Sequence, residues 1–282
     1  MSLYLRVLHP TLRPPRFCGH SRGETVSQKR LAICNQKGGV AKTTTAVNVA
    51  VILAQQGKRV LLVDYDPQGN ASQFLGLIEK LEDESLYTSA NLTQGSMTFA
   101  PQRDCVVKGL DVVPATDTLA SLEFELLQDN QRGAYRLGSA LSSVAQEYDY
   151  VIVDCPPTLG MLAINALVGC GNVLVPVKLS PASVPGAVRL HQTLRALQVT
   201  NPYLKVVGVV GTFLNEAAKG PKEVLGQLRE LFGAKVVLET VIHTAQGVDD
   251  ATGKGMPVVL AAPKSRGAQE YFSLTKEISD RV

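Results

Sequence analysis

The sequence predicts an α/β fold, a doubly wound and mostly parallel β-sheet with helices on both faces. Short runs rich in Val, Ile and Leu alternate along the chain with segments that suit helices. Most of these runs are continuously apolar, which is typical of strands covered on both faces. A glycine-rich turn at residues 37–44 also joins such a run to a helix. This pattern places ligand chemistry at the carboxyl ends of the strands.

Seven strands and seven main helices are expected in alternation, beginning at Leu31. The expected strands are residues 31–35, 59–64, 110–114, 149–154, 172–177, 205–212 and 235–239. The expected helices are residues 44–56, 118–128, 134–147, 159–168, 183–198, 221–232 and 267–280. Residues 78–105 are less regular, and we expect loops with a short helix there.

The positive charge of the chain is concentrated in its first thirty residues. The first thirty residues carry six basic side chains against Glu24 alone, whereas the whole chain has a net charge of +3. With three prolines and little periodicity, residues 1–29 are expected to be a basic, disordered extension. An Arg-rich, acid-poor segment is also typical of a transit peptide, and that alternative stays open. Residues 30–282 are expected to form a single domain.

Composition argues against a membrane span and against a metal site built from protein ligands alone. The longest mostly apolar stretch, residues 46–54, is far shorter than the roughly 20 residues that a spanning helix needs. Five cysteines and four histidines are scattered, without a C-x-x-C pair or a Cys/His cluster. We therefore expect a cytoplasmic protein whose cysteines are reduced.

The glycine-rich turn has the sequence expected of a loop that binds phosphates. Backbone N–H groups of such a turn and of the following helix point into one concavity and favour an anion. Lys42 is placed to reach the β- and γ-phosphates of a nucleotide, and the Thr43 hydroxyl to ligate Mg²⁺. Ala41 stands where glycine is usual, which costs about 1–2 kcal/mol if the backbone is left-handed there and little otherwise. The nucleotide-binding candidates are Lys37, Gly38, Gly39, Val40, Ala41, Lys42, Thr43 and Thr44.

Two further segments deliver carboxylates at the ends of apolar strands. The first runs from Val60 to Asn70 and contains Asp64 and Asp66, which strand alternation puts on the same side of the chain. The second ends at Asp154, which precedes two prolines. Beside a phosphate-binding loop, such carboxylates point to Mg²⁺ ligation and to the positioning of a water molecule.

These motifs resemble those of the ParA/MinD family, which are P-loop NTPases with a deviant Walker A loop. The extra lysine of that loop is Lys37. Residues 64–70 resemble the family's switch I motif D-x-D-P-Q-G-N, and residues 154–157 its Walker B and switch II segment. Residues 263–269 are close to the P-x-S-x-G-A-x pattern of ParA/Soj-type partition ATPases. The resemblance covers roughly residues 30–282.

The resemblance assigns roles to single residues. It implies that Lys37 reaches across an ATP-bound homodimer to the partner's phosphates, and that Lys42 and Asp66 also serve catalysis, Asp66 by orienting the attacking water. Asp64 and Asp154 would hold Mg²⁺ with Thr43, the aspartates through water. Asn215, after another strand, has two open interpretations: it reads the adenine edge or it forms a turn.

The resemblance also implies a function. Such proteins hydrolyse ATP to ADP and phosphate, slowly alone and faster with a ParB-type centromere-binding partner. Their ATP dimer binds DNA nonspecifically and segregates chromosomes or plasmids, which implies a nucleoid-associated location in the cytoplasm. The arginines that many ParA proteins carry before the G-x-P segment are absent from residues 242–247 here. The remaining candidates for DNA contact are Lys254, Lys264 and Arg266, each of which could equally be an ordinary surface charge.

Three alternatives use the same fold. A ParA-like ATPase can position a protein cargo instead of DNA. A MinD-like ATPase cycles on membranes and would be expected to end in a basic amphipathic helix, whereas residues 271–282 carry mixed charge and suggest a docked helix. An iron–sulfur reductase would need cluster cysteines at a dimer interface, and Cys155 and Cys170 show no such pattern.

Overall fold

The structure is a computed structural model, and it describes residues 28–77, 83, 85–95, 98–129, 132–218, 220–244 and 255–282. The basic extension expected at residues 1–29 lies outside the described residues, except for its last two positions. Lys29 already belongs to the first strand, so the ordered fold begins two residues before the strand that the sequence predicts.

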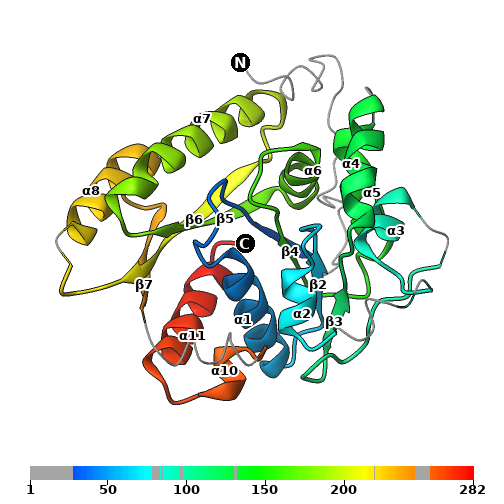
Figure 1. Cartoon of the computed structure of the whole chain (residues 1–282), viewed down its shortest axis with the longest axis horizontal. Helices are drawn as coiled ribbons and strands as arrows, with labels where there is room; N and C mark the ends of the chain where they lie inside the picture. Colours follow the sequence, from blue (N-terminus) through cyan, green and yellow to red (C-terminus); the bar gives the residue numbers. More distant parts are fainter. Residues whose placement is uncertain are drawn as a thin grey trace.

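Seven strands of the described chain form one sheet, and every neighbouring pair runs parallel (Figure 1). The order across the sheet is β3-β2-β4-β1-β5-β6-β7. The central strands are buried on both faces, which explains their unbroken runs of Val, Ile and Leu. The strands are β1 (Lys29–Ile33), β2 (Val60–Asp64), β3 (Leu110–Val113), β4 (Tyr150–Asp154), β5 (Asn172–Lys178), β6 (Lys205–Leu214) and β7 (Val237–His243).

Helices cover both faces of the sheet (Figure 1). One layer consists of α1 (Lys42–Gln55), α2 (Asn70–Phe74), α10 (Val258–Ala261) and α11 (Arg266–Ser279). The other consists of α3 (Ser89–Gln94), α4 (Thr118–Gln128), α5 (Arg136–Ser143), α6 (Met161–Cys170), α7 (Val184–Thr200) and α8 (Pro221–Phe232), with the 3₁₀ helices η3 (Gly133–Tyr135) and η4 (Pro181–Ser183). The layers bury two apolar clusters, one on each side of the sheet.

The doubly wound fold is confirmed, and all seven expected strands and seven expected main helices are present. The expected helix 134–147 is wrong in detail, because η3 precedes α5 and the latter ends at Ser143. The expected short helix within residues 78–105 is α3. The four- and five-residue helices α10 and α2 were not predicted, because so few residues show no helical periodicity.

The strand order positions the candidate site. In the sheet register Asp64 pairs with Asp154, and Asp154 pairs with Ile33, so the carboxyl ends of β2, β4 and β1 lie side by side. The helix that follows β1 and the helix that follows β5 pack on opposite faces of the sheet, and a doubly wound fold typically binds its ligand where neighbouring strands connect in this way. The loop from β1 to α1 occupies this position.

The C-terminal motif has a structural role in this fold. Ser265 caps α11, since its hydroxyl oxygen accepts a hydrogen bond from the Ala268 N–H at 3.2 Å. The apolar face of α11, which includes Tyr271, Leu274 and Ile278, is buried in the cluster that contains α1. Among the residues that the structure describes, no helix has both the length and the apolarity to cross a membrane.

Candidate nucleotide-binding site

The loop between β1 and α1 has two residues with left-handed backbone. Gly39 has a φ of 66° and Ala41, which directly precedes α1, a φ of 68°. Glycine adopts this conformation readily, whereas alanine does so at a cost of about 1–2 kcal/mol. The sequence left open whether Ala41 has a left-handed backbone. The structure shows that it does, so this alanine carries the strain that a glycine would avoid.

Contacts from two other strands hold the loop in place. The Asn35 side-chain amide donates to the Pro176 carbonyl of β5 at 2.6 Å, and its Oδ1 accepts from the Lys37 N–H at 3.1 Å. The Thr212 hydroxyl of β6 donates to the Val40 carbonyl at 3.2 Å. Sequence analysis missed Asn35 and Thr212. Their positions at the ends of apolar strands were the available signal, but their partners are distant in sequence.

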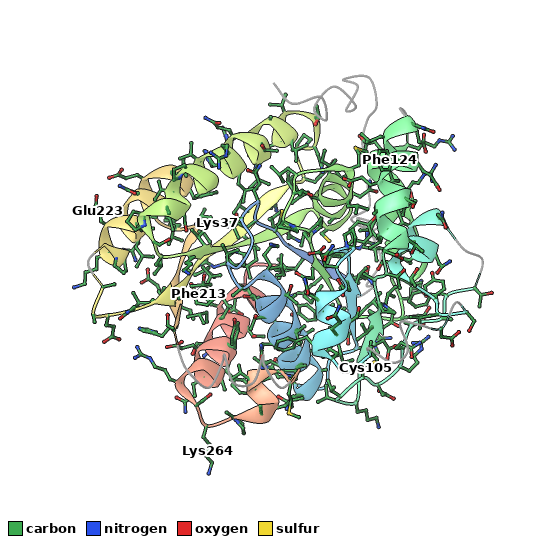
Figure 2. The ribbon with its side chains drawn as sticks, viewed as in Figure 1. Lys37, Cys105, Phe124, Phe213, Glu223 and Lys264 are labelled. Atoms are coloured by element: carbon green, nitrogen blue, oxygen red, sulfur yellow. The ribbon has the colours of Figure 1, made fainter. Side chains whose placement is uncertain are left out.

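The two lysines of the loop point to different partners. Lys42 is 7% exposed, and its Nζ donates to the Lys37 carbonyl at 3.4 Å. The Lys37 Nζ donates to the Ala182 carbonyl at 3.2 Å and to the Ser183 hydroxyl at 3.1 Å, both at the end of η4. Lys37 lies above the start of α1 in Figure 2. The ammonium of Lys37 is thus bound by its own chain.

Asp64 lies at the carboxyl end of β2 and is fully buried. Its Oδ2 accepts hydrogen bonds from the Ser72 hydroxyl at 2.7 Å and from the Ser72 N–H at 2.8 Å. Burial nevertheless raises the pKa of Asp64 from 3.8 to about 6, and the Ser72 hydrogen bonds oppose that rise. Ser72, in α2, is a further residue that sequence analysis did not identify.

Asp154 has the most unfavourable environment of the three aspartates. It is fully buried, and within the described part of the chain no group meets hydrogen-bond geometry with either carboxylate oxygen, although the Thr43 hydroxyl lies near them. Burial first, and then repulsion from Asp64, raise the pKa of Asp154 well above its usual range, while Thr43 and Lys42 oppose the shift. A carboxylate left in this state is costly unless a cation neutralises it.

This donor set fits Mg²⁺, a hard cation that prefers oxygen ligands and retains water. The orphaned oxygens of Asp154 lie beside Thr43, whose hydroxyl supplies another oxygen. Among the described residues, no group of three or more His, Cys, Asp or Glu side chains could hold a metal by itself. The remaining ligands would therefore be phosphate and water, as in other phosphate-binding loops.

Asp66 begins the turn that follows β2. Its Oδ1 accepts from the Gln68 N–H at 3.1 Å, and burial raises its pKa while the Lys42 ammonium opposes that rise. Gly69 closes the turn with a φ of 62°, and a Cβ there would lie 3.0 Å from the Ala115 carbonyl oxygen. The glycine of the D-x-D-P-Q-G-N motif is thus required by both backbone conformation and space.

Asn215 adopts the turn-forming role in this structure. Its side-chain oxygen accepts from the Ala217 N–H at 3.0 Å, and its carbonyl accepts from the Ala218 N–H at 3.1 Å. The side-chain amide can still donate to a ligand, since the turn uses only the oxygen. Its contact with adenine stays a prediction.

The three DNA-contact candidates are in different situations. Lys254 lies outside the described residues, and Lys264 is exposed and points away from the protein body (Figure 2). The Arg266 guanidinium forms ion pairs with Glu216 and Glu270, each at 2.9 Å. These pairs offset the positive charge that a DNA phosphate would meet, so the case for Arg266 is weaker than its sequence suggested.

The cysteines near the site are part of the core. Cys34 and Cys155 are fully buried at adjacent strand ends, and Cys170 is 5% exposed. A contact with the Cys34 thiol, together with burial, raises the pKa of Cys155 and makes it a poor nucleophile. The described cysteines therefore give no support to the iron–sulfur alternative.

Comparison with known proteins identifies the family. The AAA domain family matches residues 28–206. The chain is 42% identical over 252 residues to the sporulation initiation inhibitor protein Soj of Bacillus subtilis, a match that covers 89% of this chain and 98% of Soj. The chain belongs to the ParA/Soj family of P-loop ATPases. The chromosome partitioning protein ParA of Caulobacter vibrioides is 39% identical, with 89% and 94% of the two chains covered.

A solved structure similar to this ParA/Soj-family chain contains ligands of the expected kind. Cobyrinic acid a,c-diamide synthase from Mycobacterium smegmatis, with an ATP analog and magnesium bound, superposes with a TM-score of 0.73. The two are 33% identical, and the match covers 88% of this chain and 93% of the other. Nucleotide and magnesium are thus ligands within this group of folds, which agrees with the unpaired carboxylate at Asp154.

Proposed function

We propose that this ParA/Soj-family chain forms an ATP-bound homodimer that binds DNA nonspecifically and segregates chromosomes or plasmids with a ParB-type partner. The proposal depends on one observation: the β1–α1 loop, Asp64 and Asp154 lie together, because β1, β2 and β4 end side by side in the sheet. That arrangement supports binding of a magnesium nucleotide. The name of the Caulobacter vibrioides relative, chromosome partitioning protein ParA, supports a partition role. The proposed setting is the nucleoid in the cytoplasm.

In this proposal each residue acts through charge or position. The loop N–H groups and Lys42 would bind the phosphates, and Thr43 and Asp154 would hold Mg²⁺, which would supply positive charge against the phosphates. Asp66 would orient a water molecule, since its carboxylate interacts electrostatically with both Lys42 and Asp154. Hydrolysis removes the γ-phosphate, and the attraction between that phosphate and Lys37 of the other subunit is lost. Hydrolysis is slow until the partner binds.

The proposal is tested by measuring assembly and DNA binding in three states: with ATP, with ADP and without nucleotide. We expect dimers and DNA binding with ATP alone, and DNA affinity that falls steeply with salt because phosphate contacts release counterions. Lys42→Ala should abolish ATP-dependent dimerisation, whereas Lys264→Ala should leave it intact. Equal DNA binding in all three states, or normal dimers from Lys42→Ala, would contradict the proposal.

One observation favours a second candidate, a ParA-like ATPase that positions a protein cargo. His243 and Thr244 occupy the stretch where many ParA proteins carry arginines, and Arg266 is neutralised by two glutamates. Weak DNA binding by an otherwise normal ATP dimer would favour this candidate. The buried apolar face of α11 gives a membrane-cycling role no comparable support.

A further inference from the structure

Lys37 is held within its own subunit by a specific pair of acceptors. Its Nζ donates to the Ala182 carbonyl at 3.2 Å and to the Ser183 hydroxyl at 3.1 Å. Ser183 is 3% exposed and precedes the first residue of α7, so its hydroxyl has a fixed position. Lys37 and Ser183 are 146 positions apart in sequence, and β1 and β5 bring them together because they are neighbours in the sheet.

The backbone of Lys37 is anchored separately from its side chain. Asn35 accepts from the Lys37 N–H and donates to the Pro176 carbonyl, which ties this part of the loop to β5. The ammonium can therefore leave Ser183 by side-chain rotation, without movement of the loop. A single flexible side chain is enough to change between the two positions.

The acceptors for Lys37 are electrically neutral. Residues 179–183 contain no acidic side chain, and the Ser183 hydroxyl lies 3.0 Å from that of Ser180. The positive end of the α7 dipole also opposes a cation at this point. A triphosphate offers charged oxygens, which form stronger hydrogen bonds to an ammonium than neutral oxygens do. We therefore expect Lys37 to exchange this contact within the subunit for a triphosphate when one is in reach.

From this geometry we propose that Ser183 and the Ala182 carbonyl hold Lys37 in an inactive position in the monomer and so raise the protein concentration at which the ATP dimer forms. The inference rests on the proposed function, because it assumes that Lys37 serves the partner's phosphates. Only the fraction of monomers with a released Lys37 is ready to dimerise, so the apparent affinity is lowered by that fraction. In this proposal Ser183 acts through its contact with Lys37.

The first experiment tests the contact in the nucleotide-free protein. Acetylation of lysines by an N-hydroxysuccinimide ester is followed by mass spectrometry, with the exposed Lys264 as internal reference. Ser183→Ala removes one acceptor and should raise the relative rate at Lys37 by about two- to threefold, as expected for the loss of one hydrogen bond of modest net strength. Ser273→Ala is the matched control, since its hydroxyl bonds to Gln269 on α11. Equal rates in Ser183→Ala and wild type would overturn the inference.

The second experiment measures dimerisation by sedimentation, with magnesium and a nonhydrolysable ATP analogue. Ser183→Ala should dimerise at about threefold lower protein concentration than wild type, by the same loss of one hydrogen bond. Ser183→Asp should require a higher concentration, because a carboxylate pairs more strongly with Lys37. Faster acetylation without a stronger dimer would also overturn the inference, because the contact would then not compete with assembly.

The two experiments separate this inference from the proposed function. A wild-type protein that remains monomeric with the analogue at all concentrations contradicts the proposed dimer. The acetylation rates still decide whether Ser183 holds Lys37 in that case. A wild-type protein that dimerises while Ser183→Ala dimerises no better leaves the proposed function intact and rejects the regulatory contact.

Discussion

The carboxyl ends of β2 and β4 differ from the β6–β7 edge of the sheet in how charges are satisfied. At β4, Asp154 is buried, and no described residue meets hydrogen-bond geometry with its carboxylate oxygens. At the β7 edge, His243, Glu270 and Arg266 contact one another at 2.6–2.9 Å. Charges that the fold leaves unsatisfied at a buried position require a ligand, whereas charges that satisfy one another contribute to the structure. This difference separates the candidate site from a surface network.

The largest effect is expected at Asp66. Asp66→Ala should lower ATP turnover by at least about 100-fold, the usual contribution of a group that positions or deprotonates a nucleophile. Because Asp66 is not among the residues proposed to hold the nucleotide, ATP-dependent dimers should persist and accumulate. Steady-state phosphate release and dimer lifetime are the measurements.

The control for Asp66→Ala is Asp117→Ala, an exposed aspartate at the start of α4 whose side chain makes no capping hydrogen bond. We expect wild-type turnover in that variant. Unchanged turnover in Asp66→Ala would refute the role proposed for Asp66, and loss of dimers would show that Asp66 is needed for nucleotide binding instead.

A second effect compares the two ends of β4. The pKa of Asp154 is raised by burial, whereas pairing with Arg59 lowers the pKa of Asp149, just before the strand. Asp154→Asn should therefore stabilise the nucleotide-free protein at pH 8, by about 1.4 kcal/mol for each unit by which the pKa is raised. Asp149→Asn should destabilise it by up to about 1 kcal/mol, since its ion pair is partly exposed. Thermal unfolding without nucleotide measures both.

The pH dependence follows from the same shift. A carboxyl group whose pKa is raised in the folded state stabilises the fold below its unfolded pKa, and that stability is lost as the pH rises through the folded value. For Asp64 this window runs from 3.8 to about 6, and for Asp154 it runs from 3.8 to a pKa well above that value. The wild-type protein should lose stability across this range, and Asp154→Asn should lose less. Magnesium and ATP should stabilise the wild-type protein against unfolding, and they should stabilise Asp154→Asn much less. An identical pH profile for both proteins would contradict the assignment.

The contrast between regions also explains what the sequence could predict. The buried strands and the motifs at Asp64 and Asp154 were predictable, because continuous apolar runs and short spacings are local properties of the chain. The partners of Lys37 and Asn35 were not, because they lie more than 140 positions away. Sequence analysis left Arg266 open as a DNA contact or an ordinary surface charge, and it did not predict the ion pair with Glu216, which lies 50 positions away.

A smaller effect concerns the loop backbone. Ala41→Gly should stabilise the nucleotide-free protein by about 1 kcal/mol, because the left-handed φ of 68° no longer strains a Cβ. Such a change corresponds to a rise of about 2–4 °C in Tm for a chain of this size. Gly39→Ala is the matched reverse change, since its φ is 66° and a Cβ there would meet nothing within 4 Å. That variant should lose a similar amount, and a stability gain from it would show that the strain lies elsewhere.

The smallest effect is expected at the β7 edge. It tests whether an arginine that is already paired with glutamates contributes to DNA affinity. Arg266→Ala should change the affinity of the ATP dimer for DNA by less than about twofold, because Glu216 and Glu270 already offset its charge. Lys264→Ala removes an exposed cation that has no ion pair with any described residue, and it should lower the slope of log affinity against log salt by about one. Glu216→Gln releases Arg266 from one ion pair and should strengthen DNA binding modestly. Arg266→Ala could instead weaken binding more than Lys264→Ala does. In that case the Arg266 guanidinium leaves its glutamates to pair with a DNA phosphate, and the β7 edge is a ligand-binding surface.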